Sequence, residues 1–320
     1  MHEKIRNNIN EISLCIVMNN GELIEKNAQQ ELLDMNNRII YHPLTATPLK
    51  RNIAYTELTP CKELHSYIRC YWGTENPLIQ IENNDSPKLV IPDTCVDIIY
   101  HIDYTDNVVT GGFCGINDYS FHANSSGTIG HMVSSFAICF YAWTAYAFAD
   151  DSLQSTMNGY FDMGSRFEWL DRFIRPQLLE RKTLQEKASF TEQVLLKRLS
   201  NVKENTVVNG TIHNILTNKG SMDVSKLAKE AFVSTRQLER LFHEYVGITP
   251  KKLSNLIRYQ FLWRDILCEP DFDVLSAVHK YGYTDQSHLL REFKRYHSMD
   301  IHEARTIALK DVENIQAVSY

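Results

Sequence analysis

The nine residues STRQLERLF at positions 234–242 recur 51 positions later as DQSHLLREF at 285–293. In each copy a polar capping residue stands four places before a leucine, and an arginine and a phenylalanine follow at the same spacing. Ser and Asp begin helices by accepting a hydrogen bond from the first turn, and Leu and Phe four residues apart share one helix face. The repeat predicts two short amphipathic helices, with the equivalences Ser234–Asp285, Leu238–Leu289, Arg240–Arg291 and Phe242–Phe293.

The residues around the two copies predict an all-helical domain over about 205–309. Gly247 ends the first copy, and Thr249 followed by Pro250 begins a helix that should run to Cys268, about 28 Å at 1.5 Å per residue. A helix over 274–281 and a turn at Gly282 then lead into the second copy, in which Leu289, Leu290 and Phe293 are expected to be buried. Two exposed helices separated by such a linker suit two successive major grooves on one face of DNA.

These residues resemble the C-terminal module of the AraC/XylS family of bacterial transcription regulators, over about 95 residues. The family usually has Gly-x-Thr-Pro after the second Phe-Lys-Arg, where this chain has Ser298-Met299-Asp300-Ile301, and its usual second Ile-Ala pair is Ala277-Val278 here. The resemblance implies DNA binding through both helices and regulation of nearby promoters. The matching segments are Leu227-Ala228, Val233-Ser234, Leu238-x-Arg240-x-Phe242, Gly247-x-Thr249-Pro250 and Tyr281-Gly282-Tyr283-x-Asp285-x-Ser287-His288-Leu289-x-Arg291-x-Phe293-Lys294-Arg295.

The resemblance also implies which side chains meet DNA. Arginine binds guanine through two hydrogen bonds and glutamine does the same for adenine, whereas lysines better suit phosphates. The competing interpretation is that Arg240 and Arg291 only pair with the local acids Glu244 and Glu292. The expected base-reading residues are Arg236, Glu239, Arg240, Gln286, Ser287, His288 and Arg291, and the expected phosphate contacts are Ser234, Thr235, Gln237, Lys251, Lys252, Lys294 and Arg295.

The charge of the chain supports DNA binding less clearly. Residues 221–320 hold 14 basic and 14 acidic side chains, so the net charge of −6 lies entirely in residues 1–220. DNA-reading domains usually present a basic face. A positive surface must therefore come from segregation, with Asp265, Glu269, Asp271 and Asp273 held away from the phosphates.

From about residue 53 to 163 the sequence consists of short apolar runs rich in β-branched and aromatic residues. Strands are expected over 88–92, 96–102, 108–114, 128–133 and 135–143, which favours an antiparallel barrel or sandwich. This half resembles the barrel-like domain found ahead of some AraC-type modules. The expected fold is α+β with two domains: an extension of unclear role (1–50), a β-rich sensing or dimerisation domain (51–165), a helical connector (166–204), the double helix-turn-helix domain (205–309) and a tail (310–320).

Two kinds of site are conceivable in the β-rich half. Six residues could line an effector pocket, although core packing is the competing interpretation: Trp72, Asp97, Tyr100, Phe113, Phe140 and Trp143. A metal-dependent, cupin-like β-barrel enzyme is an alternative function, with candidate ligands Cys95, Asp97, His101, Cys114, His122 and His131. Because HxH, CxxC and HExxH spacings are absent, we predict no metal site and no cofactor.

The remaining features favour a non-enzymatic regulator in the cytoplasm. The seven cysteines are widely spaced and odd in number, which indicates a reduced compartment, and no apolar run approaches the roughly 18 residues that span a bilayer. No catalytic triad, phosphate loop or dinucleotide motif is present. The resemblance implies double-stranded DNA as a partner, with RNA polymerase, a small-molecule effector and a second copy of the chain as further candidates. It favours an activator by family habit. A helical module kept only for protein contacts is the other alternative.

Overall fold

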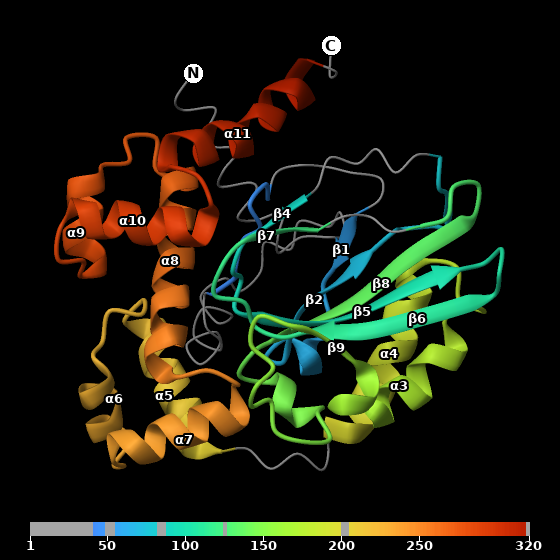
Figure 1. The fold of residues 1–320 in the computed structure, drawn as a ribbon, viewed down its shortest axis with the longest axis horizontal. Helices are drawn as coiled ribbons and strands as arrows, with labels where there is room; N and C mark the ends of the chain where they lie inside the picture. Colours follow the sequence, from blue (N-terminus) through green and yellow to red (C-terminus); the bar gives the residue numbers. More distant parts are fainter. Residues whose placement is uncertain (1–40, 49–54, 82–87, 124–126, 200–204, 318–320) are drawn as a thin grey trace, which may run out of the picture.

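The computed structural model describes residues 41–48, 55–81, 88–123, 127–199 and 205–317, with side chains up to residue 310. Most of the N-terminal extension, 1–50, lies outside the described residues. The described chain forms a sheet-rich N-terminal half and an all-helical C-terminal half (Figure 1). This confirms the predicted α+β fold class.

The N-terminal half is built on an antiparallel sheet in the order β1-β2-β8-β5-β6-β9, with β3 paired to the start of β8 and β4 paired to β7 in a small second sheet. Within the described residues the edge strands β1 and β9 do not pair, so the expected barrel is open. The strand predicted over 128–133 is wrong, because the chain turns at Gly130 and β8 begins only at Met132. The strands are β1 (Thr56–Leu58), β2 (Ile68–Gly73), β3 (Leu78–Ile79), β4 (Lys88–Val90), β5 (Cys95–Asp103), β6 (Val108–Cys114), β7 (Phe121–Ala123), β8 (Met132–Tyr141) and β9 (Tyr160–Asp162).

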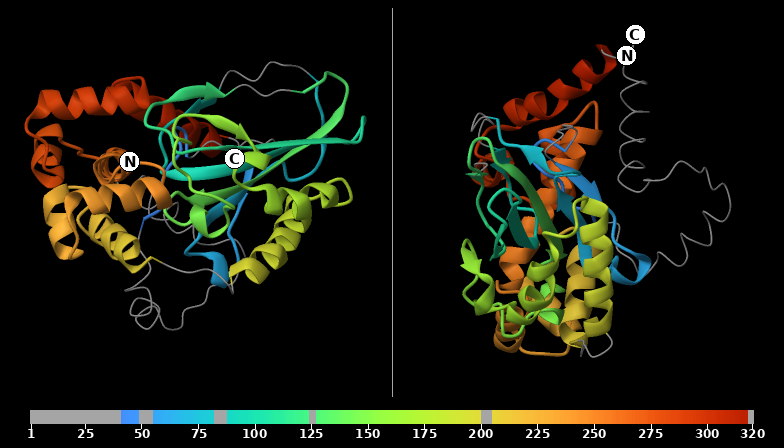
Figure 2. Two further views of the ribbon diagram at one scale, coloured as in Figure 1. Left: turned by 60° about the horizontal axis from the view of Figure 1, so that its bottom comes forward. Right: turned by 90° about the vertical axis from the view of Figure 1, so that its right-hand side faces the viewer.

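The two faces of this sheet differ in chemistry. Side chains alternate along a strand, so Val96, Ile98 and Tyr100 of β5 point to one face, where they are buried in the main core. Helices α3 (Glu168–Ile174) and α4 (Leu184–Leu199) lie on one side of the sheet (Figure 2). The other face carries Cys70, Trp72, Cys95, Asp97 and Cys139, and we call it the cysteine face. Short 3-10 turns connect these elements at Lys62–Leu64, Ala145–Ala147, Met163–Ser165 and Arg175–Gln177.

The C-terminal half contains the predicted helices. Ser234 caps α7 through a hydrogen bond from the Gln237 backbone (3.2 Å), and Asp285 caps α10 through one from the His288 backbone (2.8 Å). The predicted bounds of α8 and α9 are confirmed. The helices are α5 (Thr206–Thr217), α6 (Val224–Glu230), α7 (Thr235–Tyr245), α8 (Pro250–Cys268), α9 (Val274–Tyr281), α10 (Gln286–His297) and α11 (Ile301–Ala317), the last continuing past the predicted domain end at 309.

The structure explains how the second unit tolerates its departures from the family pattern. Ser298 takes the left-handed conformation (φ +65°) that Gly247 takes in the first unit (φ +85°). Asp300 then accepts a hydrogen bond from the Glu303 backbone (2.9 Å), as Thr249 does from Lys252 (3.2 Å). Asp300-Ile301 therefore replaces Thr-Pro as a helix start.

One expected core position in the second unit is wrong. Leu290 is 44% exposed, whereas Leu289 and Phe293 are buried as expected. Leu289 and Phe293 lie four residues apart and share the core-facing side of α10, and Leu290 is rotated about 100° away from Leu289. Because Leu289 and Leu290 are adjacent in the helix, they cannot both point into the same core.

Helix α8 is the central element of the C-terminal half. Fourteen of its 19 residues are buried, which is far more than one helix face. Gln260 bonds to Leu44 and to the Pro92 carbonyl, and the Trp263 indole donates to the Thr45 carbonyl (3.0 Å). The helix thus packs against both helix-turn-helix units and against the N-terminal half.

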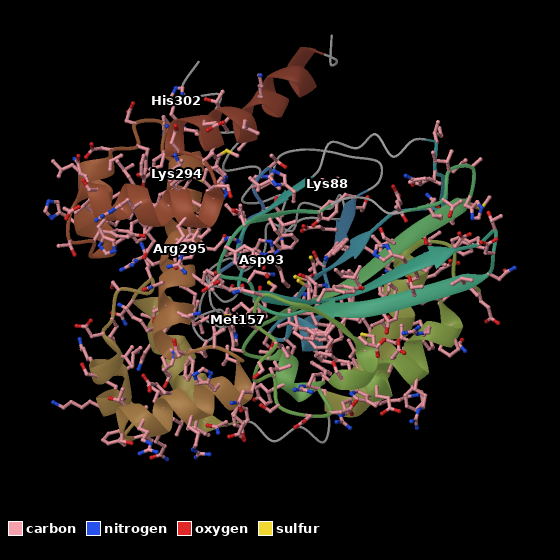
Figure 3. The ribbon with its side chains drawn as sticks, in the orientation of Figure 1. Lys88, Asp93, Met157, Lys294, Arg295 and His302 are labelled. Carbon is pink, nitrogen blue, oxygen red and sulfur yellow. The ribbon has the colours of Figure 1, made fainter. Side chains whose placement is uncertain are left out.

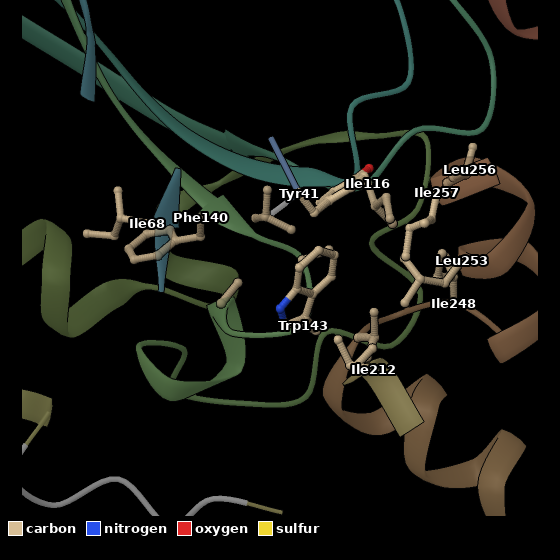
Figure 4. Packing of buried hydrophobic residues seen from close by; sticks show 14 of the residues in the cluster. Tyr41, Ile68, Ile116, Phe140, Trp143, Ile212, Ile248, Leu253, Leu256 and Ile257 are labelled. Atoms are coloured by element: carbon tan, nitrogen blue, oxygen red, sulfur yellow. The ribbon is translucent and has the colours of Figure 1, made fainter. Parts of the chain in front are cut away.

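An apolar cluster joins the two halves of the molecule. Figure 4 shows Tyr41, Ile116 and Trp143 of the N-terminal half beside Ile212 and Leu253 of the helical half. All five side chains are buried and belong to one continuous core. Burial of this apolar surface stabilises the observed placement of the halves.

We expect a matched pair of glycine substitutions to shift stability in opposite directions. A Cβ at Gly220 (φ +73°) would lie 2.0 Å from the Ser254 carbonyl oxygen of α8, so Gly220→Ala should lower the free energy of unfolding by at least about 2 kcal/mol. A Cβ at Gly210 in α5 meets no atom within 4 Å, so Gly210→Ala should raise it by up to about 1 kcal/mol. Urea unfolding of both variants tests this, and a stable Gly220→Ala variant would contradict the close approach of this turn to α8.

Candidate nucleic-acid interface

Helices α7 and α10 lie near opposite ends of α8 (Figure 1). Of the seven expected base-reading residues, six are exposed and His288 is half-buried. The apolar sides of both helices, by contrast, are buried through Leu238, Phe242, Leu289 and Phe293. The repeat therefore presents two polar helix faces to solvent at equivalent positions.

The two repeated arginines are not held by strong ion pairs. Arg240 lies 3.6 Å from Glu244, and the two side chains are 68% and 47% exposed, so solvent screens the pair. Arg291 donates to the Ser287 carbonyl (3.1 Å) and makes no ion pair with any described residue. Glu292 is instead bound by Arg258 (2.7 Å) and the Tyr283 hydroxyl (2.8 Å). Both guanidinium groups are therefore available to a ligand.

The acidic residues of the helical half are mostly used internally. Lys280 pairs with both Asp265 (2.6 Å) and Glu269 (3.0 Å). Asp273, Asp285 and Asp300 accept backbone hydrogen bonds at helix starts. The net charge of this region is zero, but many of its acidic side chains are bound within the protein, whereas several of its arginines and lysines face solvent.

The expected phosphate-binding residues fall into two groups. Thr235, Gln237, Lys251 and Lys294 are exposed, as is Ser234, whose hydroxyl caps α7. Lys252 and Arg295 are both paired with Asp118 of the N-terminal half, at 3.0 Å and 3.4 Å. Figure 3 shows Lys294 and Arg295 projecting from α10. The pairing with Asp118 was not visible in the sequence, because more than a hundred residues separate the partners.

Asp118 is held firmly in place. Asn158 donates its side-chain amide to the carboxylate (2.8 Å) and accepts the Asp118 backbone N–H (2.9 Å). Burial raises the pKa of Asp118, but the hydrogen bond from Asn158 and the ammonium of Lys252 outweigh it and lower the pKa overall. The group is therefore an anion at neutral pH and holds both cations in ion pairs.

The N-terminal half contacts both reading helices at positions 51 residues apart. The Glu244 carbonyl at the end of α7 accepts hydrogen bonds from Ser152 and Leu153, and the equivalent residue of α10 is Arg295, which bonds to Asp118. Three residues further on, Gly247 lies against the Leu153 carbonyl and Ser298 bonds to Ser120. These contacts lie at the C-terminal ends of α7 and α10 and leave the expected base-reading positions uncovered.

The six residues expected at an effector pocket are not brought together. Tyr100, Phe113 and Phe140 are fully buried in the main core, and Trp143 lies in the cluster between the halves. Trp72 and Asp97 lie on the cysteine face, where the indole donates to the carboxylate (2.9 Å). The aromatic set is thus divided between the two sides of the sheet, as core packing would give.

The six candidate metal ligands do not all meet at one place. His131 lies beside Asp103 and Asp106, while Cys95 lies beside Asp93 and Cys139. Asp93 and Cys139 were missed because sequence spacing does not report which strands become neighbours.

A double helix-turn-helix unit with two exposed polar helix faces is typical of DNA-binding proteins. A family model described as a helix-turn-helix domain matches residues 227–306, and a domain of unknown function, DUF6597, matches residues 56–162. The chain carries an AraC-type helix-turn-helix domain, which confirms the resemblance found in the sequence.

Similar solved structures are distant. ToxT from Vibrio cholerae O395 has 10% identity and a TM-score of 0.35, covering 74% of this chain and 98% of ToxT. Unsaturated fatty acid bound wild-type ToxT from Vibrio cholerae strain SCE256 has 10% identity and a TM-score of 0.32, covering 81% and 97%. No curated protein matches the chain.

Asp118→Asn should strengthen DNA binding by about 1 kcal/mol, roughly fivefold, because it frees Lys252 and Arg295 from two partly exposed ion pairs. The dependence of affinity on salt should also steepen, since more cations then displace counterions from DNA. Fluorescence anisotropy with a labelled duplex at several salt concentrations measures both. Asp106→Asn, an exposed acid at the far end of β5, is the control. If Asp118→Asn bound DNA more weakly, the contact of Asp118 with Lys252 and Arg295 would instead keep the two helix-turn-helix units in the arrangement that DNA binding requires.

Proposed function

We propose that this protein is a sequence-specific transcription regulator that reads two adjacent major grooves with α7 and α10. The observation that carries the proposal is the pair of repeated arginines, Arg240 and Arg291, exposed and without strong partners at equivalent positions of two helices. α8 sets their separation, and its length of about 28 Å is near the roughly 34 Å of one DNA turn. The capped starts of both helices agree with this use.

The base-reading set proposed above remains Arg236, Glu239 and Arg240 in α7 with Gln286, Ser287, His288 and Arg291 in α10. Lys251 and Lys294 are free to contact phosphates, and Lys252 and Arg295 become free when Asp118 releases them. Phosphate contacts fix the register of the protein, and base contacts supply the specificity.

Regulation belongs to the same proposal. The N-terminal half contacts both reading helices at equivalent positions, which supports control by an effector or partner bound to that half. We propose a non-enzymatic activator acting in the cytoplasm, with RNA polymerase and a second copy of the chain as further partners. Among the described residues, none of the helices combines the length and apolarity that crossing a bilayer requires.

Arg240→Ala and Arg291→Ala should each weaken specific DNA binding by about 1–3 kcal/mol, because each removes a two-hydrogen-bond contact to a base. Duplexes selected by the wild-type protein from a random pool provide the ligand, and competition with unselected duplex separates specific from general affinity.

Arg172→Ala is the matched control for this experiment. Arg172 is an exposed arginine paired with Glu168 four residues away in α3, as Arg240 is paired with Glu244 in α7. It should leave DNA affinity unchanged. If neither reading-helix variant loses specific affinity, the helical module serves protein contacts instead.

A further inference from the structure

Sulfur and carboxylate ligands converge on the cysteine face of the sheet. Cys70 of β2 pairs with Cys139 of β8, and Cys139 pairs with Asp97 of β5, so the three form one cross-strand row. Cys95 lies two residues before Asp97 and therefore on the same face. Cys70, Cys95 and Cys139 are all buried and form a cluster against Trp72. Three of the seven cysteines in the chain thus meet at one place.

The geometry of this cluster is close to that of a metal site. One ligand atom each from Asp93, Cys95 and Cys139 lies within 4.8 Å of the other two. Sulfur ligands about 2.3 Å from one Zn²⁺ lie about 3.8 Å apart in a tetrahedral site. Side-chain rotations that bring the ligand atoms about 1 Å closer together would therefore be enough to form a tetrahedral site. Cys70 is the register partner of Cys139 on the neighbouring strand, so its side chain lies on the same face beside this group.

The charges around the cluster are unbalanced. The Arg69 guanidinium forms its ion pair with Glu57 (3.1 Å), and its other hydrogen bonds go to the Pro43 carbonyl (3.1 Å) and to the Cys70 sulfur (3.0 Å). The Asp93 carboxylate accepts a hydrogen bond from the Cys95 backbone (3.1 Å) and forms no ion pair with any described residue. The Asp93 backbone carbonyl accepts hydrogen bonds from the Thr94 hydroxyl (2.6 Å) and the Cys95 thiol (3.5 Å). A partly buried carboxylate without a counterion is costly, and a bound cation would remove that cost.

We propose that Asp93, Cys95 and Cys139 bind one thiophilic divalent cation of the Zn²⁺ or Cd²⁺ class, with Cys70 as a fourth ligand once its side chain turns from Arg69 toward them. Thiolates select such soft cations over Mg²⁺ and Ca²⁺, which prefer all-oxygen sites. Each cysteine that binds the ion releases its thiol proton to solvent. Asp93 is half-buried and lies between the sheet and α8 (Figure 3), so it offers the ion a path of entry.

The proposed site is connected to the helical half through the segment before β5. The carbonyl of Pro92 accepts a hydrogen bond from Gln260 at the middle of α8. Thr94 has φ +62°, a conformation that β-branched residues rarely adopt, and its hydroxyl bonds to Tyr41 (2.9 Å). The Tyr41 ring in turn packs on Phe261 of α8, with ring centres 5.4 Å apart. Drawing Asp93 toward the sulfurs would move this segment and alter its contacts with α8.

Cadmium titration of the reduced full-length protein tests the site. Cd²⁺ bound to thiolates absorbs in the ultraviolet, so the wild-type protein should show a band that saturates at one ion per chain. The band should be lost in a variant that carries both Cys95→Ser and Cys139→Ser. It should persist in Cys268→Ser, which removes a half-buried cysteine in α8. Absence of the band in the wild-type protein, or its survival in the double variant, would overturn the proposal.

If the double variant fails to fold, the site can still be tested in the wild-type protein by measuring how Cd²⁺ protects its cysteines from alkylation. In wild-type protein under mild denaturant, Cd²⁺ should slow alkylation of Cys95 and Cys139, mapped by mass spectrometry, and leave Cys268 unaffected. Equal alkylation of all three cysteines with and without Cd²⁺ would contradict the site.

The coupling to DNA rests on the proposed function and is measured separately. Zn²⁺ should change the DNA affinity of the wild-type protein at least about fivefold and that of Cys139→Ser not at all. An unchanged affinity in metal-loaded wild-type protein would refute the coupling, while the cadmium band would still establish the site. Failure of the protein to bind any selected DNA would instead refute the proposed function.

Discussion

The burial of α8 is the constraint on which the rest of the structure depends. This one helix forms part of the core of both helix-turn-helix units and also makes several of the contacts to the N-terminal half. Gln260, buried at its middle, bonds through its side-chain amide to backbone groups of Leu44 and Pro92. Separating the halves would leave a polar side chain and apolar surface without partners, and both changes cost free energy. The N-terminal half is therefore part of the framework that orients the reading helices.

Much of the helical half could be predicted from the sequence because its signals are local. Ser234, Thr249 and Asp285 mark helix starts, and their hydrogen bonds are made within three residues. The start of α8 followed from the Thr249 cap, and the end of α9 followed from the turn at Gly282. The repeat also predicted which faces of α7 and α10 are exposed, since Arg240 and Arg291 lie on the helix sides away from the repeated leucine and phenylalanine, which must be buried.

The N-terminal half was less predictable because its contacts are long-range. Strand content over 96–102 and 108–114 was evident from β-branched residues, but the order of strands was not. The row of Cys70, Cys139 and Asp97 exists only because β8 lies between β2 and β5. The pairing of Asp118 with Lys252 and Arg295 has the same origin. Spacing rules for metal and phosphate sites cannot detect side chains that meet only after the sheet has formed.

The two reading helices are held by the N-terminal half through contacts of different physical kinds. The first unit meets it through hydrogen bonds from the Ser152 hydroxyl and the Leu153 backbone to the Glu244 carbonyl. The close approach of Gly247 and the Tyr146–Tyr245 ring contact, with ring centres 4.8 Å apart, add to this contact. The second unit meets it through the ion pair of Arg295 with Asp118 and the contact of Ser298 with Ser120. Arg295 is 61% exposed, so salt and competing phosphates weaken its pair, whereas they hardly affect packed rings and backbone hydrogen bonds. A signal that alters the N-terminal half should therefore release the second unit first, while the first unit stays in place. The Asp300 cap and the hydroxyl of Ser298, which distinguish the second unit from the family pattern, lie at this weaker contact.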